Sequence, residues 1–326
     1  MEKSIETCEK SILSVGLVCL DIINICEDFP NEDSDQRVLD QRWQRGGNAA
    51  NTAAVLNMLS QKCEFFGTLS KAPVVRYVEE DFKSLGINMD HCVYLERNDF
   101  PTSCVLINAK NGSRTIMHHN KNWHEPTFED FKRLDLFKYS WIHFEGRNGT
   151  ELLKMMASVI EWNKNISDSA SRIILSLELE KDKAGMDLLH DKVDLLFLGK
   201  MYAESRGFLD MRETVHHFIN FVKIGASVVC AWGEEGACGQ TKTTVGCDTD
   251  SEKLHKSSIF PPEGGVVDTL GAGDTFLSGI IYHFRKKQDL AKALEFGCRL
   301  AGAKCGVQGW SPLREICQEL KKLYEI

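Results

Sequence analysis

The stretch GGVVDTLGAGDTF, residues 264–276, decides how this chain is organised. The apolar pair Val266-Val267 predicts a short buried strand, and Asp268-Thr269 predicts a turn directly after it. The small residues Gly271-Ala272-Gly273 follow, and an apolar pattern at helical spacing begins at Asp274. The stretch therefore predicts a strand, a tight turn and the beginning of a helix.

The segment Gly271-Ala272-Gly273 is suited to binding an anion. The first turn of a helix carries N–H groups without intrahelical partners, and the helix dipole is positive there. A glycine within a helix costs about 1 kcal/mol relative to alanine, so two glycines here favour close approach of a ligand over helix stability. We predict an anion site with the Asp274 carboxylate beside it, the alternative being that Asp274 is only the N-cap.

Length and composition indicate one large globular domain. The chain has 326 residues, of which 43% are hydrophobic, and a formal net charge of −8. The acidic balance argues against nucleic-acid binding, which needs a basic surface. The first apolar run, residues 12–25, is too short and too polar for a membrane span or a signal peptide. With 12 cysteines in no paired motif, we expect reduced thiols, a cytoplasmic location and no membrane partner.

Strands alternate with helices along most of the chain, which predicts an α/β fold with a mainly parallel sheet covered on both faces. In such a sheet, ligands bind at the carboxyl ends of the strands. The expected strands cover residues 12–19, 64–67, 141–144, 173–177, 193–198 and 227–232. The expected helices cover residues 48–59, 74–85, 151–162, 211–222, 274–287, 290–305 and 314–324.

Two segments, 21–43 and 102–119, break this alternation. The second reads as two strands around Asn111-Gly112, a strong hairpin signal. We predict that both segments form a small β lid, and that residues 1–20, 44–101 and 120–326 form the core. The alternative is that these segments are additions to the edge of the main sheet and do not form a lid.

Several polar residues are predicted to lie where such a sheet binds ligands. Asp21 follows the first strand, Asp33 lies in a loop, and Asn48 and Asn51 stand three apart at the start of a helix. Carboxylates accept hydroxyl protons, and amides both donate and accept, so these groups suit a polyhydroxy ligand. Each also has a structural interpretation as a turn, loop or cap residue.

The quoted stretch matches the DTxGAGD signature of the ribokinase-like (PfkB) carbohydrate kinases, and residues 46–51, GGNAAN, resemble the N-terminal signature of that family. The segments at 41–48, 112–116, 141–148, 230–236 and 296–306 resemble its ketohexokinase branch. The similarity extends from about residue 12 to about residue 309. The resemblance implies a ribokinase-like three-layer core with a small β-sheet lid.

The resemblance also implies a reaction. It is the ATP-dependent phosphorylation of D-fructose at the 1-hydroxyl, with Mg²⁺ as cofactor and K⁺ as a candidate activator. A kinase for ribose, a nucleoside or another sugar is the alternative, and a sugar-binding protein without catalysis is a third hypothesis.

The resemblance assigns a role to each site residue. Asp274 would be the base, Gly271, Ala272 and Gly273 the anion hole, and Arg114 a phosphate ligand. Cys298 would lie in the ATP site. The sugar would be held by Asp21, Asp33, Gly47, Asn48, Asn51 and Asp274.

Three further expectations concern chemistry and assembly. A carboxylate at a helix N-terminus should be a weak base. The family's central Asn-x-x-Glu motif is missing at residues 200–203, so no Mg²⁺ ligand is assigned. The pair His118-His119 is expected to be surface or edge histidines. Apolar lid residues Val105, Ile107 and Ile116 have no predicted core to face, which predicts a homodimer joined through the lids.

Overall fold

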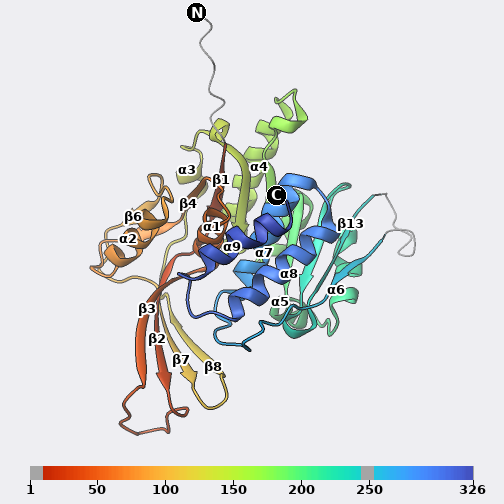
Figure 1. Cartoon of the computed structure of the whole chain (residues 1–326). Helices are drawn as coiled ribbons and strands as arrows, with labels where there is room; N and C mark the ends of the chain where they lie inside the picture. The colour runs from red at the N-terminus through yellow and green to blue at the C-terminus, as the bar shows by residue number, and fades with distance from the viewer. Residues whose placement is uncertain (1–9, 244–252, 326) are drawn as a thin grey trace, which may run out of the picture.

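The computed structural model describes residues 10–243 and 253–325, and Figure 1 shows their arrangement. In this part of the chain, eight strands form one large sheet in the order β14-β13-β12-β11-β10-β9-β1-β4. The strands from β12 to β4 are parallel, and β13 and β14 join antiparallel at one edge. Their bounds are β1 Ser11–Val15, β4 Cys63–Phe66, β9 Tyr139–Glu145, β10 Ile174–Leu179, β11 Leu195–Gly199, β12 Ser227–Ala231, β13 Ala237–Thr241 and β14 His255–Ser257.

Helices cover both faces of this sheet, because its strands are apolar on both sides and need cover on both. The two faces bury separate hydrophobic clusters, so the core has three layers, as predicted. One face packs against α1 Asn48–Met58, α7 Ala272–Lys287, α8 Leu290–Cys305 and α9 Leu313–Leu323. The other packs against α3 Phe128–Phe131, α4 Gly149–Lys164, α5 Lys200–Ser205 and α6 Met211–Phe218.

A second sheet, β3-β2-β7-β8, projects from the core at the bottom of the view in Figure 1. Its strands are β2 Cys19–Cys26, β3 Asp40–Gly46, β7 Thr102–Asn108 and β8 Arg114–His119. They come from the two segments that break the alternation, and we call this sheet the lid. The first predicted strand, residues 12–19, is therefore wrong as one element: β1 ends at Val15, and the chain then passes into the lid.

The remaining elements are small. β5 Thr68–Ser70 and β6 Val93–Leu95 pair beside α2 Val75–Leu85, which ends at the predicted Gly86. The 3₁₀ turns are η1 Leu136–Lys138, η2 Ser169–Ser171, η3 Met186–Lys192, η4 Ile219–Phe221 and η5 Gly233–Glu235.

The predicted buried strand at Val266-Val267 is wrong. The two side chains are 66% and 59% exposed, and neither residue lies in a strand. The amide of Val267 donates instead to the carbonyl oxygen of Cys305, at the end of α8, at 2.7 Å. The apolar pair therefore lies in a loop that leads into α7.

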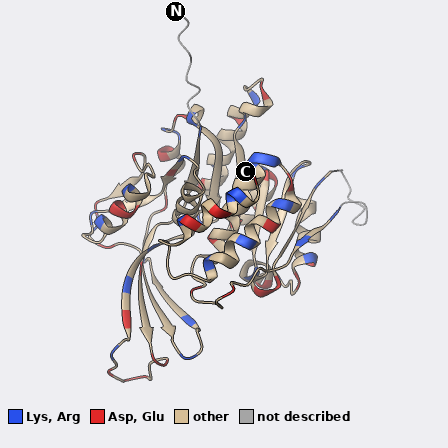
Figure 2. Ribbon diagram, in the orientation of Figure 1, with Lys and Arg blue, Asp and Glu red and all other residues tan. Residues whose placement is uncertain are grey.

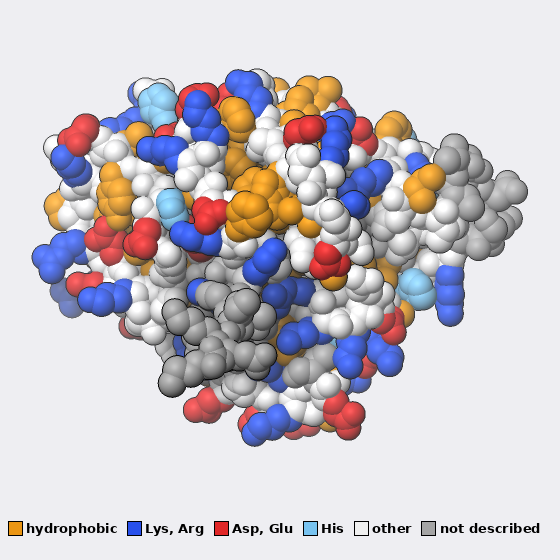
Figure 3. All heavy atoms as spheres, turned by 90° about the horizontal axis from the view of Figure 1, so that it is seen from above, with side chains coloured by type: hydrophobic (Ala, Val, Ile, Leu, Met, Phe, Trp, Pro, Cys, Tyr) orange, Lys and Arg blue, Asp and Glu red, His pale blue; other side chains and the backbone are white. Residues whose placement is uncertain are grey.

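Charged residues lie mainly in the outer helices and loops rather than along the central strands (Figure 2). The face of the molecule seen from above in Figure 3 carries interspersed positive and negative side chains. Among the described helices, none is long and apolar enough to cross a membrane. The described cysteines are all free thiols.

Candidate active site

A cleft of about 610 Å³ lies between the carboxyl ends of the central strands and the lid. Its lining comes from the lid, from the ends of β9, β10, β11 and β12, and from the beginnings of α1, α5 and α7. Most of the predicted site residues line it together, namely Asp21, Gly47, Asn48, Asn51, Arg114, Gly271, Ala272, Gly273 and Asp274.

The beginning of α7 is open to this cleft. Gly271 is the N-cap residue with φ 78°, a left-handed conformation that favours glycine, and a Cβ here would overlap the Trp310 ring. A Cβ on Gly273, by contrast, would meet no atom within 4 Å. In the described part of the chain, no backbone carbonyl accepts a hydrogen bond from the amides of Gly273 or Asp274. These two N–H groups are therefore available to an anion.

Asp274 lies in the first turn of α7 and is not its N-cap, so the capping alternative is wrong. Its side chain is buried, and its Oδ2 accepts a hydrogen bond of 2.7 Å from Nδ2 of Asn51. The carboxylate and the free amides of the helix thus share one end of the cleft.

Burial raises the pKa of Asp274 well above its ordinary value. The negative charges of Glu180 and Glu145 raise this pKa further, whereas the Asn51 hydrogen bond and the Arg45 charge lower it. Burial therefore acts against the weak base expected from the helix N-terminus alone, because loss of solvent disfavours the charged form. A raised pKa makes Asp274 a stronger proton acceptor once it is ionised.

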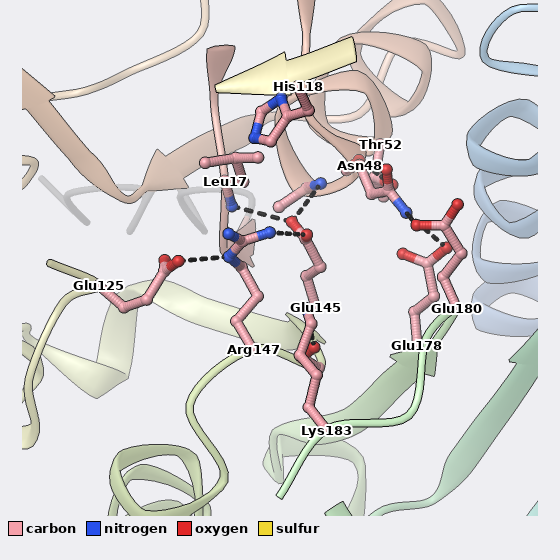
Figure 4. A network of polar contacts seen from close by, with 12 residues as sticks. Leu17, Asn48, Thr52, His118, Glu125, Glu145, Arg147, Glu178, Glu180 and Lys183 are labelled. Carbon is pink, nitrogen blue, oxygen red and sulfur yellow. Dashed lines mark hydrogen bonds and ion pairs between the residues drawn. The ribbon is translucent and has the colours of Figure 1, made fainter. Parts of the chain in front are cut away.

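The predicted sugar ligands that line the cleft come from β2 and from the beginning of α1. Asp21 is on β2, is 7% exposed, and has a pKa that burial raises. Asn48 begins α1, and its Nδ2 donates to Oε1 of Glu178 at 3.1 Å and to Oε2 of Glu180 at 3.2 Å (Figure 4). Gly47 directly precedes α1 and also lines the cleft.

A buried ion-pair network organises the floor of the cleft (Figure 4). Arg147 contacts Glu125 at 2.5 Å and Glu145 at 2.9 Å. Oε2 of Glu145 also accepts hydrogen bonds from the amides of Leu17, at 2.8 Å, and Ala49, at 3.3 Å. Although burial opposes ionisation, Arg147 and the Leu17 amide hold the pKa of Glu145 below its ordinary value. Glu145 thereby joins the end of β1 to the beginning of α1.

Glu178 and Glu180 supply donors that suit a hard cation. Burial, together with the nearby Asp274 charge, raises the pKa of Glu178 well above its ordinary value. Its Oε2 is buried and lacks a hydrogen-bond partner among the described residues. Mg²⁺ prefers oxygen ligands and is commonly held by one or two carboxylates, water and substrate phosphates. In the described ranges there is no group of three or more His, Cys, Asp or Glu side chains that could hold a metal by itself.

Two lid arginines contact consecutive residues of the 264–276 stretch. Arg114 on β8 donates from Nη1 to the Thr269 hydroxyl. Arg42 on β3, at the other edge of the lid, lies 3.2 Å from Oδ2 of Asp268. Asp268 is also held by the fully buried Lys304, whose Nζ lies 3.4 Å from the same oxygen. Both edges of the lid are thus tied to the loop that precedes α7.

Strand register separates the two faces of the lid. Ile23, Val105 and Ile116 are register partners and therefore point to one side, the side that carries Asp21 and His118. Val105 is only 1% exposed, and Ile116 lines the cleft. The expectation that Val105, Ile107 and Ile116 lack a surface to face is therefore wrong for Val105, whereas Ile116 stays 47% exposed at the edge of the cleft.

The opposite face carries the exposed apolar row. Trp43, Ile22, Cys104 and Met117 are successive register partners across the four strands. Trp43 is 46% exposed and Met117 is 53% exposed. His118 is exposed on the edge strand β8, as predicted, and it also lines the cleft, where its Nδ1 lies 3.0 Å from Oγ of Ser103.

Two predicted site residues do not reach the cleft. Asp33 is exposed in the loop that joins β2 to β3, with φ 58°. Cys298 is buried on α8, and its pKa is raised by burial while a hydrogen bond with Ser257 of β14 lowers it. Their proposed roles in sugar and ATP binding stay predictions.

Sequence reasoning missed Glu145, Arg147, Glu178, Glu180 and Arg45 as site residues. A signal was present for the glutamates, because Glu145 and Glu178 directly follow predicted apolar strands at their carboxyl ends. No comparable local signal marks Arg45, whose partners are distant in the sequence.

The chain belongs to the pfkB family of carbohydrate kinases, since the profile of that family matches residues 9–316. It is also 40% identical to mouse ketohexokinase over 302 residues, which cover 93% of this chain and 98% of that relative. A nucleoside kinase of Methanocaldococcus jannaschii is 24% identical over 309 residues, covering 90% of this chain and 88% of that protein.

Solved structures support the same fold. Arabidopsis thaliana ribokinase, in complex with ribose and ATP, superposes with a TM-score of 0.74 at 20% identity and covers 96% of this chain and 99% of its own. Giardia lamblia ribokinase superposes with a TM-score of 0.76 at 14% identity, with 97% and 99% covered. The predicted ribokinase-like fold is confirmed.

Proposed function

We propose that this protein transfers the γ-phosphoryl group of ATP to the 1-hydroxyl of D-fructose, giving fructose 1-phosphate and ADP. One observation carries the chemistry: the buried Asp274 carboxylate lies beside two free amides at the beginning of α7, within a cleft lined by polar groups. The preference for a ketohexose is supported by the 40% identity to mouse ketohexokinase over nearly the whole chain.

The sugar would lie between the lid and α1. Asp21 would accept hydrogen bonds from sugar hydroxyls, and the Asn48 and Asn51 amides would donate and accept. These groups would hold the reacting hydroxyl next to Asp274, and positioning of this kind is a major part of catalysis in phosphoryl transfer.

The phosphoryl group would be received at the first turn of α7. The 1-hydroxyl oxygen forms a bond to the γ-phosphorus, the bond from that phosphorus to the β,γ-bridging oxygen breaks, and ADP leaves. Asp274 takes the hydroxyl proton. The amides of Gly273 and Asp274, with Arg114 from the lid, would stabilise the charge on the transferring group.

Glu178 and Glu180 would hold Mg²⁺, directly or through water. When bound, the ion neutralises charge on the ATP phosphates. This assignment rests on the unpartnered buried oxygen of Glu178 and on the position of both carboxylates in the cleft lining. The K⁺ requirement stays a prediction of the family resemblance.

A panel of acceptors tests the proposal. Purified protein with ATP and Mg²⁺ would be assayed for ADP release with D-fructose, other hexoses, D-ribose and nucleosides, and the product phosphate would be located by ³¹P and ¹³C NMR. We expect the highest kcat/KM for D-fructose and phosphate on O1. A higher kcat/KM for ribose or a nucleoside would show that the substrate is that compound and not D-fructose. Sugar binding without ADP release would show that the protein binds sugar but does not phosphorylate it.

We also propose a homodimer in which the lids of two subunits meet. The support is the outer row of Trp43, Ile22, Cys104 and Met117, which is apolar and partly exposed, although Trp43 at one end of the row also packs against Tyr77 of α2. Exposed sheet surfaces of this kind are usually paired or buried, and a two-fold contact is the commonest arrangement.

A further inference from the structure

We propose that Arg45 is a positioning residue for Asp274, acting through the amide of Asn51. Arg45 lies near the end of β3, where the lid joins the core, and only 1% of its side chain is exposed. Its Nη1 donates to Oδ1 of Asn51 at 2.6 Å, and Nδ2 of Asn51 donates to Oδ2 of Asp274 at 2.7 Å. The inference goes beyond the proposed function and rests on it only where turnover is the readout.

The relay fixes which way the Asn51 amide points. A guanidinium can only donate hydrogen bonds, so Arg45 must face the amide oxygen of Asn51. The amide nitrogen is then left to donate to Asp274. If Arg45 were absent, the amide could rotate and present its oxygen to the carboxylate, which would repel it.

The guanidinium is itself anchored from two sides. Its Nε donates to Oδ2 of Asp81 on α2 at 2.6 Å. The rings of Phe82 and Trp310 lie 5.3 Å and 5.9 Å from its central carbon, within the range of cation–π attraction. The same Trp310 ring packs beside Gly271, the N-cap of α7. Arg45, on strand β3 of the lid, therefore contacts both α1 and α2 next to the Asp274 carboxylate.

Charge supports the same role. The groups that act on the Asp274 carboxylate are Glu145 from β9, Glu178 and Glu180 from β10 and the residues after it, Asn51 from α1, and Arg45. The three glutamates oppose ionisation of Asp274, whereas Arg45 and Asn51 favour it. Loss of Arg45 removes both a positive charge and the orientation of the one amide that donates to the carboxylate in the described structure.

Three variants separate these contributions. Arg45→Met removes the charge and the fork of donors. Arg45→Lys keeps the charge but cannot reproduce the two-sided contact with Asp81 and Asn51. Asp81→Asn loosens the anchor and leaves Arg45 in place. Arg285→Met is the matched control, because Arg285 is a partly buried arginine at the far end of α7 that binds Gln61 and Ser140.

The first measurement is the ionisation of Asp274, followed by ¹³C NMR of ¹³Cγ-labelled aspartate and assigned with Asp274→Asn. The pKa of Asp274 should rise in Arg45→Met, rise less in Arg45→Lys and Asp81→Asn, and stay at the wild-type value in Arg285→Met. This readout does not depend on which sugar is phosphorylated, so failure of the relay is distinguishable from failure of the proposed function.

The second measurement is the pH profile of kcat. Because the base must be deprotonated, the acid limb should move to higher pH in Arg45→Met, with a loss of about 10- to 100-fold at neutral pH, the usual effect of one hydrogen bond to a charged group. Since Arg45 acts through Asn51, the double variant Arg45→Met/Asn51→Ala should lose no more than Asn51→Ala alone.

Other results would overturn the relay. An Asp274 titration in Arg45→Met that coincides with wild type, an equal shift in Arg285→Met, or losses that multiply in the double variant would each do so. If Arg45→Met does not fold, Arg45→Lys and Asp81→Asn decide by the same titration, and unchanged values in both would refute the proposal.

Discussion

Replacing Gly273 by alanine should separate catalysis from stability. Gly273 lies in the first turn of α7 with ordinary helical φ, and a Cβ there would meet no atom within 4 Å. Alanine is favoured over glycine in helices by up to about 1 kcal/mol, so the variant should be as stable as wild type or slightly more stable. The added methyl group would nevertheless stand in the cleft where the amides receive the phosphoryl group. Loss of access to such donors lowers kcat by about 100-fold or more.

Gly271 should behave in the opposite way. Its φ of 78° costs alanine roughly 1–2 kcal/mol. A Cβ there also overlaps the Trp310 ring, so the loss of stability should exceed that conformational cost. Gly86 is the matched control for the conformational cost alone, because it has φ 71° and a methyl group there would meet no atom within 4 Å.

Thermal unfolding and steady-state kinetics on the three variants test this reasoning. The unfolding temperature should fall most for Gly271→Ala, less for Gly86→Ala, and not at all for Gly273→Ala. Activity should fall strongly in Gly273→Ala and stay near wild type in Gly86→Ala. A Gly273→Ala enzyme with wild-type kcat would show that the phosphoryl group is not received at this helix.

Three further predictions concern the lid. Arg42→Met should raise KM for the sugar more than it lowers kcat, because the ion pair between the lid and Asp268 is lost. The control Arg76→Met, at an 82% exposed arginine, should change neither constant. Equal effects of the two variants would contradict a role for the Arg42–Asp268 ion pair. Arg114→Ala should raise KM for ATP or lower kcat far more than it weakens sugar binding, measured by calorimetry. Lys110→Ala, at the same hairpin, is the control. Equal losses of turnover and of sugar binding in Arg114→Ala would count against a phosphate contact. Met117→Glu should yield monomers, with the mass measured by light scattering. Leu209→Glu, at an 81% exposed position on the core, should keep the mass of the wild type. If the mass of Met117→Glu also equals that of the wild type, the outer face of the lid is not the dimer interface.

Much of the core could be predicted because its signals are local. The helix expected at residues 290–305 is α8 Leu290–Cys305, and the stop at Gly86 follows from a left-handed C-terminal residue. The beginning of a helix at Gly271-Ala272-Gly273 could also be predicted, and the anion site at that position stays a prediction.

The errors arise where long-range contacts decide. Val266-Val267 has a strand-like composition, but its loop crosses the end of α8 and no strand pairs with it in the described structure. The pKa of Asp274 depends on burial and on Glu145 and Glu180, which sequence spacing does not reveal. Arg45 belongs to the site only because α1, α2 and α7 meet around it.

The central claim is that Asp274 accepts the proton of a sugar hydroxyl as the phosphoryl group is transferred. The most direct measurement compares wild type and Asp274→Asn for D-fructose binding by calorimetry and for fructose 1-phosphate formation in a single turnover with ATP. We predict that the variant binds fructose with an affinity close to that of wild type and forms product about 100- to 10,000-fold more slowly, as expected for loss of a general base. A variant that forms fructose 1-phosphate at the wild-type rate would contradict the account.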